Sequence, residues 1–509
     1  MNEVKRLRTE NLLLRKQVLE LQTTNAQFVT QVLELQTANA RLVMQVSEAQ
    51  QAFEKLQGQV TSLTSQLQQD SRNSHWPPSR DKQRKKRRTK SQRRKSNKAA
   101  GGQQGHEGKT LEFSSEPDEV ITHRPECCRH CQEPFDPAQA AESVNKRQVH
   151  DLPPLRLIVT EHQSENLRCS NCQELSQGSF PETVTARAQY GPRVRQLALY
   201  LKIQQLIPYD RSRQLFADLF DANLSTGTLQ NIVNQAAATL QPTLEEIKQA
   251  LRDGELLHGD ESGFYIKGKR HWLHVASNER LTYYLAHPKR GREAIEALAI
   301  LPYFQGTAIH DFWASYQPYD NCKHSLCNTH QLRDLIAIGE EGPSQAWAFR
   351  FHSFLLRIKA IVDHQRALGA TAFSPEKIEQ LNRLYDRLVS AALAANPPPP
   401  DGWPKGKRGR AKKSKARNLA ERFERHRSQV LAFAYAFKVP FDNNLAERDI
   451  RMLKVQQKIS GCFRSQEGAD AFCAIRSYLS SMRKHSYSVW DALASVVNGR
   501  SVSPLSLPV

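Results

Sequence analysis

The chain has 509 residues, with 72 Lys and Arg against 52 Asp and Glu, a net charge of +20 and a pI near 9.6. This length has room for about three or four domains, and the excess of positive charge favours a polyanionic partner, nucleic acid before an anionic membrane surface. The N-terminus is too charged for a signal peptide, and the longest apolar run, residues 430–437, is too short to span a bilayer, so we expect no membrane insertion and a cytoplasmic location.

The first predicted element is one long helix over residues 4–67. Residues 18–31 (VLELQTTNAQFVTQ) are followed directly by a near copy at 32–45, and a repeat of this length equals two heptads. Leucine recurs every seven residues from Leu7 to Leu63, interrupted by Phe28 and Ala49, while Val and Asn occupy the complementary core positions. This combination favours two parallel strands, and the buried Asn residues fix their register. The helix over residues 4–67 would be about 95 Å long at about 1.5 Å per residue. We expect residues 1–75 to form a leucine-zipper-like coiled coil that gives a homodimer or higher homo-oligomer.

Two basic tracts follow. Residues 80–98 hold twelve Lys or Arg among nineteen residues, and such a run cannot fold alone, so residues 76–100 are predicted to be a disordered linker that also contacts phosphates. Residues 402–417 resemble an AT-hook at KRGRAK, but Ala411 stands where that motif has Pro, so we expect nonspecific phosphate contact first. The candidate DNA-contacting residues of the two tracts are Arg84, Lys85, Lys86, Arg87, Arg88, Arg408 and Arg410.

Nine cysteines, four of them in two CxxC pairs, indicate bound metal rather than disulfides. Cys128 with Cys131, and Cys169 with Cys172, supply the four thiolates of a tetrahedral structural Zn²⁺ site. Residues 147–169 between the pairs have the pattern of strand, turn and strand, so residues 101–185 are predicted to be a small zinc-binding β domain. Cys127 and His123 are spare candidates that we interpret as a free thiol and a surface imidazole.

Residues 186–245 are predicted to be helical. The stretches 208–220 and 225–240, with Ser225 or Thr226 as N-cap, fit a helix-turn-helix that reads DNA and fit an ordinary pair of antiparallel helices equally well.

An alternation of strands and helices with acids at particular positions occupies residues 246–340 and 441–500. Strands are predicted at 255–267, 271–277, 281–287 and 306–311, and helices at 292–304 and 441–459. Asp260 lies on the first strand, Asp311 ends the fourth, and Glu447 lies in the first turns of the last helix. Carboxylates hold Mg²⁺ together with phosphate oxygens, and two ions about 3.5–4 Å apart stabilise the attacking and leaving oxygens of an in-line displacement. Each acid alone could be a turn residue, a helix cap or an i,i+4 partner, but the ordered trio indicates an ion site.

Motifs along nearly the whole chain carry a specific resemblance. They are GGQQGHEG (101–108), the CxxC pairs flanking DLPPLRLIVTEH, GDESGFYIKGKRHWLHV, HDFWASY, CNTHQLRDL and NNLAERDIRMLKVQQKISGCFRS. In this order they resemble the transposases of the insertion-sequence-66 family, and the order of strands, helices and acids resembles the ribonuclease-H-like fold of DDE transposases and integrases.

The resemblance implies a multidomain α+β protein whose ribonuclease-H-like α/β core is interrupted by a helical insertion at 341–440 and followed by a tail at 501–509. It implies that Asp260, Asp311 and Glu447 hold two Mg²⁺ or Mn²⁺ ions. It also implies a bacterial, nucleoid-associated enzyme that acts on the terminal inverted repeats of a mobile element, with accessory proteins encoded by the same element as further partners.

Cys327 and His330 in CNTH resemble C-x-x-H elements that support the active site of several DDE transposases. We interpret them as packing residues, or His330 as a contact to the scissile phosphate, rather than as a separate metal site. Arg448, Arg451 and Lys454 are candidate DNA contacts on the Glu447 helix, or else a solvated basic face.

Three functions are compatible with the sequence. They are a transposase that cleaves a phosphodiester and then transfers the strand, a metal-dependent nuclease of the same fold without strand transfer, and an inactive dimeric DNA-binding protein. The intact triad argues against the third.

Overall fold

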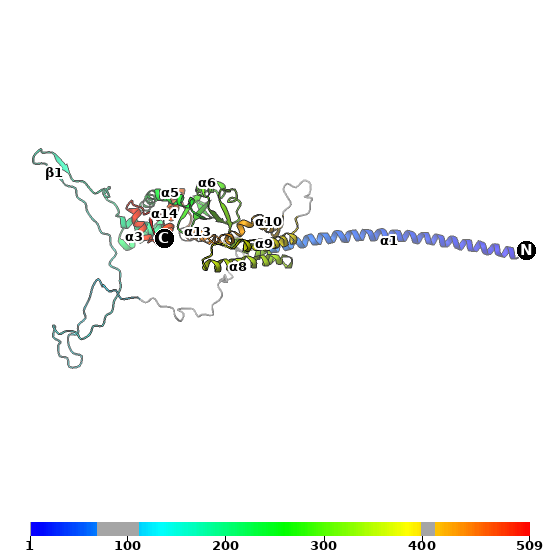
Figure 1. The fold of residues 1–509 in the computed structure, drawn as a ribbon, viewed down its shortest axis with the longest axis horizontal. Helices are drawn as coiled ribbons and strands as arrows, with labels where there is room; N and C mark the ends of the chain where they lie inside the picture. The colour runs from blue at the N-terminus through cyan, green and yellow to red at the C-terminus, as the bar shows by residue number, and fades with distance from the viewer. Residues whose placement is uncertain (1, 69–110, 399–412, 509) are drawn as a thin grey trace.

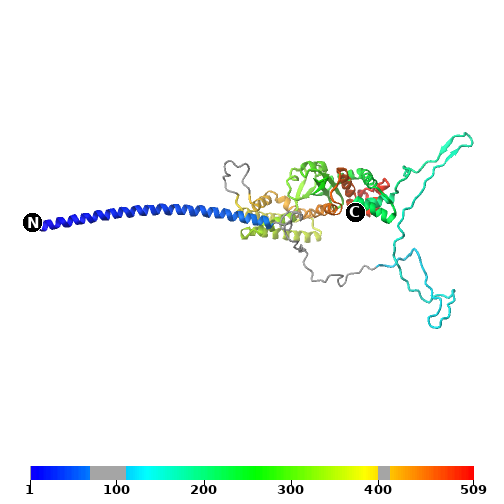
Figure 2. The ribbon, with the colours of Figure 1, turned by 180° about the vertical axis from the view of Figure 1, so that it is seen from behind.

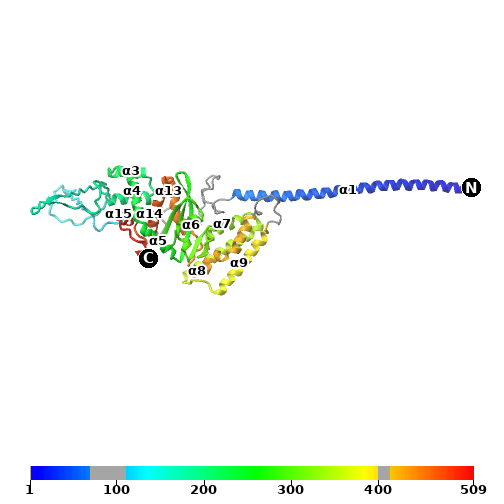
Figure 3. The ribbon, with the colours of Figure 1, turned by 90° about the horizontal axis from the view of Figure 1, so that it is seen from above.

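The protein is described from a computed structural model in which residues 2–68, 111–398 and 413–508 are placed. The candidate DNA contacts Arg84 to Arg88, Arg408 and Arg410 lie outside these residues. Helix α1 (Asn2–Gln68) extends from the body of the protein as one rod with the N-terminus at its far end (Figures 1, 2 and 3). The prediction of one helix over 4–67 is confirmed. Its heptad leucines lie uncovered, with Leu21 68% and Leu35 70% exposed.

Residues 111–185 project from the body and contain a short hairpin of β1 (Asn166–Arg168) and β2 (Leu175–Gln177) (Figure 1). The second CxxC pair lies in the turn of this hairpin. The predicted pair of strands over 147–169 was wrong, because within the described residues of that stretch only β1 pairs. Pro153 and Pro154 lack the backbone N–H that a ladder needs, and Val149 and Ile158 remain 91% and 85% exposed.

Residues 192–252 contain four α-helices: α2 (Pro192–Leu199), α3 (Tyr209–Phe220), α4 (Thr226–Thr239) and α5 (Gln241–Arg252). The predicted helical stretches 208–220 and 225–240 are confirmed as α3 and α4. Helix α3 ends at Asp221, which has a left-handed conformation with φ of 49°. Ser225 caps α4, because its Oγ accepts a hydrogen bond from Thr228 N–H at 3.0 Å. The inner faces of these helices belong to the same apolar core as one face of the central sheet.

The central sheet has five strands in the order β5-β4-β3-β6-β7. Their bounds are β3 Leu256–Ile266, β4 Lys269–Ser277, β5 Thr282–His287, β6 Thr307–His310 and β7 Lys323–Leu326. Strands β3, β4 and β5 are antiparallel neighbours, whereas β6 runs parallel to β3, and β7 parallel to β6. The four predicted strands are confirmed within a few residues, and β7 was not predicted.

Helices cover both faces of the sheet. On one face, Ile295 and Leu298 of α6 (Arg292–Leu298) join a core with Leu257 and Ala308. The rest of the predicted helix 292–304 is a separate 3₁₀ turn, Leu301–Tyr303. The other face is covered by α13 (Asn444–Ser460) and α14 (Gln466–Lys484), and α15 (Val489–Val497) packs against α14.

The segment predicted as a helical insertion, residues 341–440, is helical in most of its described part and shares one apolar core with β7 and α7 (Asn328–Gly339). It follows α7 and consists of α8 (Ala346–Ala367), α9 (Pro375–Ala395), α10 (Lys415–Arg425), α11 (Arg427–Val430) and α12 (Ala432–Tyr435). Phe351 and Phe423 stack at 4.3 Å between ring centroids in its centre. Helices α8 and α9 lie together beside the sheet (Figure 3). In the described part of the chain, no helix combines the length and apolar character that crossing a bilayer requires.

A buried ion pair fixes α13 against α14. Lys484 Nζ lies 2.8 Å from Asp449 Oδ2, and the two side chains are 13% and 15% exposed. We expect Lys484→Met to lower the free energy of unfolding by about 3–5 kcal/mol, because the Asp449 carboxylate is left uncompensated. Denaturant unfolding measures the change. Arg383→Met, which breaks the exposed pair with Glu379, is the control and should cost less than about 1 kcal/mol. Equal losses from the two variants would contradict this interpretation.

Candidate active site

Strand register brings Asp260, Asp311 and Cys327 into one row. His258 of β3 pairs with Ile309 of β6, the last pair of this ladder. Asp260 and Asp311 each lie two residues further along, Asp260 within β3 and Asp311 directly after the end of β6, so continuing the register sets them side by side. Cys327 N–H donates to the carbonyl of His310 at 2.9 Å, which places Cys327 beside Asp311 at the end of β7. Adjacent strands are about 4.8 Å apart. We call these three residues the strand-end row.

Asn443 places Glu447 next to this row. Its side-chain amide donates to the carbonyl of Gly259 at 2.8 Å, and its Oδ1 lies 2.9 Å from Nδ1 of His258. Its backbone N–H lies 3.3 Å from Sγ of Cys327. Glu447 is one turn further along α13, with its N–H donating to the carbonyl of Asn443 at 3.2 Å. Asn443 therefore fixes the first turn of α13 against β3 and β7.

The acids of the site influence one another electrostatically. Burial is the main reason that the pKa of Asp260 lies well above its usual range, and the charges of Glu261 and Asp311 raise this pKa further. Glu447 adds a smaller effect of the same sign. Asp260 Oδ1 accepts only the local N–H of Glu261, at 2.8 Å. The charges of the neighbouring carboxylates therefore oppose the ionisation of Asp260.

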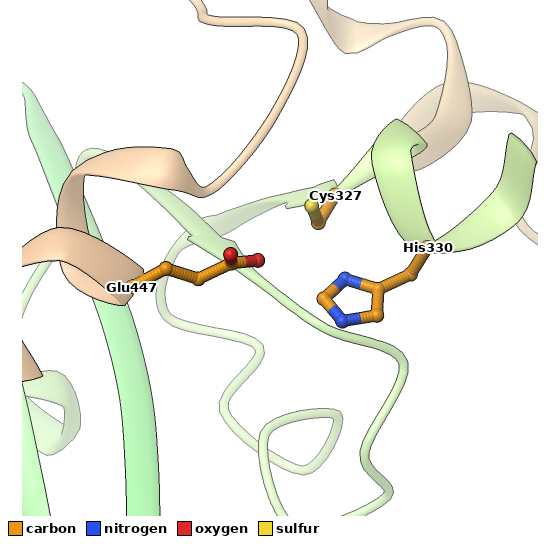
Figure 4. Close-up of side chains that lie close together, drawn as sticks. All are labelled: Cys327, His330 and Glu447. Carbon is orange, nitrogen blue, oxygen red and sulfur yellow. The ribbon is translucent and has the colours of Figure 1, made fainter. Parts of the chain in front are cut away.

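Glu447 points toward Cys327 and His330 (Figure 4). Among residues 2–68, 111–398 and 413–508, these three side chains are the group that could hold a metal ion, with ligand atoms within 4.8 Å of one another. Glu447 Oε1 and His330 Nδ1 are both buried without a hydrogen-bond partner. Burial is the main cause that raises the pKa of the Cys327 thiol to about 12. Asp260, Asp311 and Glu447 do not form an equally tight group.

Glu261, which sequence reasoning passed over, points to the opposite face of the sheet from Asp260 because neighbouring residues of a strand alternate. Its Oε1 accepts from Arg290 Nη2 at 2.6 Å and its Oε2 from the Tyr316 hydroxyl at 2.9 Å. Burial first, and then the charge of Asp311, raise the pKa of Glu261 to about 7. Its position directly after Asp260 was the signal in the sequence, but Arg290 and Tyr316 are too far along the chain to be recognised as its partners.

The three candidate DNA contacts on α13 have different surroundings. Arg448 and Arg451 are exposed, and within the described residues neither forms an ion pair. Lys454 Nζ instead donates to the carbonyl of Gly263 at 2.8 Å, and burial lowers its pKa. Lys454 therefore helps to hold α13 on β3.

The two CxxC pairs form matching turns but do not lie together. Gln132 N–H donates to the carbonyl of Cys128 at 3.0 Å, and Gln173 N–H to that of Cys169 at 2.9 Å. Both glutamines have a positive φ, 61° and 60°. Backbone N–H groups of the following residues, Cys131 first in one turn and Cys172 first in the other, lower the pKa of Cys128 and of Cys169. In the described chain the four thiols do not converge on one point.

Comparison with known families identifies the part of the chain that carries this site. The model of the Transposase IS66 family matches residues 187–471, more than half of the chain. The chain belongs to this family. The match includes the strand-end row, Glu447 and His330, so the site lies within the transposase region of an IS66-family protein, a family of enzymes that cleave and transfer DNA.

A second family overlaps the N-terminal part of this IS66-family transposase. Residues 20–112 match a family of unknown function (DUF6444). This match begins within α1 and continues through the basic residues 80–98. No curated protein matches the chain.

Proposed function

We propose that this IS66-family protein is a DDE transposase, which binds the terminal inverted repeats of a bacterial insertion sequence and catalyses metal-dependent strand cleavage and strand transfer. Asp260, Asp311 and Glu447 are its catalytic carboxylates. The observation that supports this proposal is the register of β3 and β6, which leads toward Asp260 and Asp311, together with the packing on β3 of α13, the helix that bears Glu447. The enzyme would act in the cytoplasm, at the nucleoid.

The sheet supports a ribonuclease-H-like core. Three antiparallel strands, β3 to β5, are followed by two strands that extend the sheet in parallel on the far side of β3, and helices cover both faces. Ligands of α/β sheets bind at the carboxyl ends of parallel strands. Asp311 and Cys327 directly follow the carboxyl ends of β6 and β7, and Asp260 lies on β3 just past its last paired residue with β6.

The residues present fit a divalent cation. Several carboxylates repel one another in a partly buried place, and the buried Glu447 Oε1 has no hydrogen-bond donor in the described chain. Asp260, Asp311 and Glu447 would hold Mg²⁺ or Mn²⁺, two ions per site, which stabilise the charge on the attacking and leaving oxygens when bound. Asn443 would orient Glu447, and the exposed Arg448 and Arg451 would contact the DNA phosphates. Lys454 contributes first by anchoring α13.

Cys327 and His330 are proposed to support the site. The Cys327 thiol accepts the Asn443 N–H, and the same cysteine begins α7, so it joins β7, α7 and the cap of α13. His330 faces Glu447 with an unpaired Nδ1. This atom is available to hydrogen-bond either Glu447 or a scissile phosphate. A softer ion than Mg²⁺ would suit the thiol and imidazole better, and no step of the proposed reaction requires one.

We also propose that the two CxxC turns together hold a structural Zn²⁺. Each turn already directs backbone N–H groups at its first sulfur, which favours the thiolate form that zinc requires. Purified full-length protein should contain zinc, and Cys128→Ser and Cys169→Ser should each lose the same single equivalent in metal analysis. Cys462→Ser, at an exposed free cysteine, is the control. Zinc retained by both Cys128→Ser and Cys169→Ser would exclude the four-cysteine site.

One reaction separates the proposed transposase from its alternatives. Purified protein is incubated with labelled element ends, Mg²⁺ and a target plasmid, and the products are resolved on denaturing and native gels. A transposase cleaves the end and joins it to the plasmid. Cleaved ends that are never joined indicate a nuclease, and a mobility shift without cleavage indicates an inactive DNA-binding protein.

A further inference from the structure

Four side chains form a connected cluster on the face of the sheet opposite Glu447: Glu261, Arg290, Trp313 and Tyr316, here called the Glu261 cluster. The Arg290 guanidinium lies over the Trp313 ring at 4.2 Å and over the Trp272 ring at 5.0 Å. Its Nε and Nη2 donate to one oxygen of Glu261 at 2.9 and 2.6 Å. Stacking and hydrogen bonding together fix the guanidinium in one orientation.

Both carboxylate oxygens of Glu261 accept hydrogen bonds within this cluster. Its side chain is 2% exposed, and its two oxygens accept from Arg290 and from Tyr316. A carboxylate with both oxygens committed to strong donors is poorly placed to serve as a metal ligand. Glu261 therefore differs in kind from Asp260, its neighbour in the chain, although both are buried acids near Asp311.

Two residues of the cluster, Trp313 and Tyr316, contact the segment that carries Asp311. Trp313 N–H donates to Asp311 Oδ1 at 3.0 Å, and the Trp313 ring is held by Arg290. Tyr316, held by Glu261, stacks on the ring of His310 at 4.5 Å between centroids. His310 is in turn fixed by His324 of β7, with Nε2 and Nδ1 2.8 Å apart. Asp311 therefore lies in the chain between His310, whose ring stacks on Tyr316, and Trp313, whose ring is held by Arg290.

We propose that Glu261 and Arg290 are positioning residues, whose ion pair sets the place of the Asp311 carboxylate and so the affinity of the catalytic site for a divalent cation. This inference rests on the proposed role of Asp311 as a metal ligand. Glu261 and Arg290 act through Trp313 and Tyr316 and do not touch the reacting atoms.

A positioning role and a purely electrostatic role of Arg290 predict opposite effects of Arg290→Gln on cation binding. The guanidinium carries a positive charge near the acids, so a purely electrostatic role means that Arg290→Gln tightens cation binding. If Arg290 instead positions the Asp311 segment, the same substitution weakens cation binding, although a repelling charge has been removed. Glu261→Gln weakens binding under either role, so Arg290 is the deciding residue.

The test measures Mn²⁺ binding to the full-length protein without DNA, by the electron paramagnetic resonance signal of free Mn²⁺. Glu261→Gln and Arg290→Gln should each weaken binding by roughly tenfold or more, the usual effect of removing a residue that orients a metal ligand. Arg292→Gln removes an equal charge two residues away, from a side chain that is 69% exposed, and should leave binding unchanged. Circular dichroism confirms that each variant is folded.

A second variant covers the case in which Arg290→Gln does not fold. Arg290→Lys keeps the charge but loses the planar fork and its stacking, so the positioning role predicts weaker Mn²⁺ binding and the electrostatic role predicts no change. Tighter or unchanged binding in Arg290→Gln, or unchanged binding in Arg290→Lys, overturns the inference. Asp311→Asn is measured beside them. If that variant binds Mn²⁺ like the wild type, the proposed function fails instead.

Discussion

Asp260→Ala, Asp311→Ala and Glu447→Ala should each abolish cleavage of an element end while leaving DNA binding unchanged. Each substitution removes a carboxylate from the proposed ion site and no cation that contacts phosphate. A bound ion supplies several kcal/mol of transition-state stabilisation, and about 4 kcal/mol corresponds to roughly a thousandfold in rate. Single-turnover cleavage of a labelled end, with a gel-shift titration of the same DNA, measures both quantities.

Asp320→Asn is the matched control for these variants. Asp320 is an exposed acid on the segment between β6 and β7, and neutralising it makes the same change in charge as the loss of Asp311. Its cleavage rate should equal that of the wild type. Wild-type cleavage by any of the three alanine variants would remove that residue from the catalytic set. Equal loss of cleavage and binding would point to misfolding.

Replacing Leu21, Leu35 and Leu42 of α1 with Lys should convert the protein into a monomer that still binds one DNA end at low salt but fails to pair two ends. These side chains are 58–70% exposed, and every side chain of α1 that the structure describes is exposed, so we expect a second copy to bury them. Parallel pairing would join two catalytic domains without new contacts between them, and tethering raises the effective concentration of the second end to about millimolar. Light scattering and a paired-end gel assay measure the two effects.

The control places the same three charges on the outer face of the helix. Thr23, Thr37 and Gln51 occupy heptad positions away from the leucine seam, so their replacement by Lys should leave association intact. Asn25→Val with Asn39→Val should keep association but mix oligomer numbers, because buried Asn at these positions disfavours trimers and slipped registers. A wild-type chain that is monomeric at tens of micromolar would leave the seam unexplained.

The sequence carried enough information to locate the three acids but not their surroundings. Alternation and turn residues predicted β3 to β6 because each is a local pattern bounded by local signals. Strand β7 (KHSL) is too short and too polar for such a pattern, and it pairs only because β6 lies beside it. Asn443 could be recognised as part of a helix cap, whereas its contacts with Gly259 and Cys327 depend on tertiary packing.

At the site itself, the partners of Glu261 could not be recognised from the sequence either. Strand alternation sends Glu261 and the adjacent Asp260 to opposite faces of the sheet, and the partners of Glu261 lie 29 and 55 residues further along the chain. For the cysteine pairs, the local spacing is visible in the sequence but the distance between the two pairs is not. The two pairs form matching local turns, while the binding of one Zn²⁺ by all four cysteines stays a prediction.

Metal rescue of a cysteine variant tests the central claim most directly. If Asp311 is a metal ligand, Asp311→Cys should lose cleavage in Mg²⁺, which binds thiolate poorly, and recover a substantial part of it in Mn²⁺, which is softer. The labelled-end cleavage assay is run in parallel in the two metals, with wild-type protein and Asp311→Ala as references. The account predicts recovery in Mn²⁺ for Asp311→Cys and none for Asp311→Ala. Full activity of Asp311→Cys in Mg²⁺, or the same loss in both metals, would contradict it.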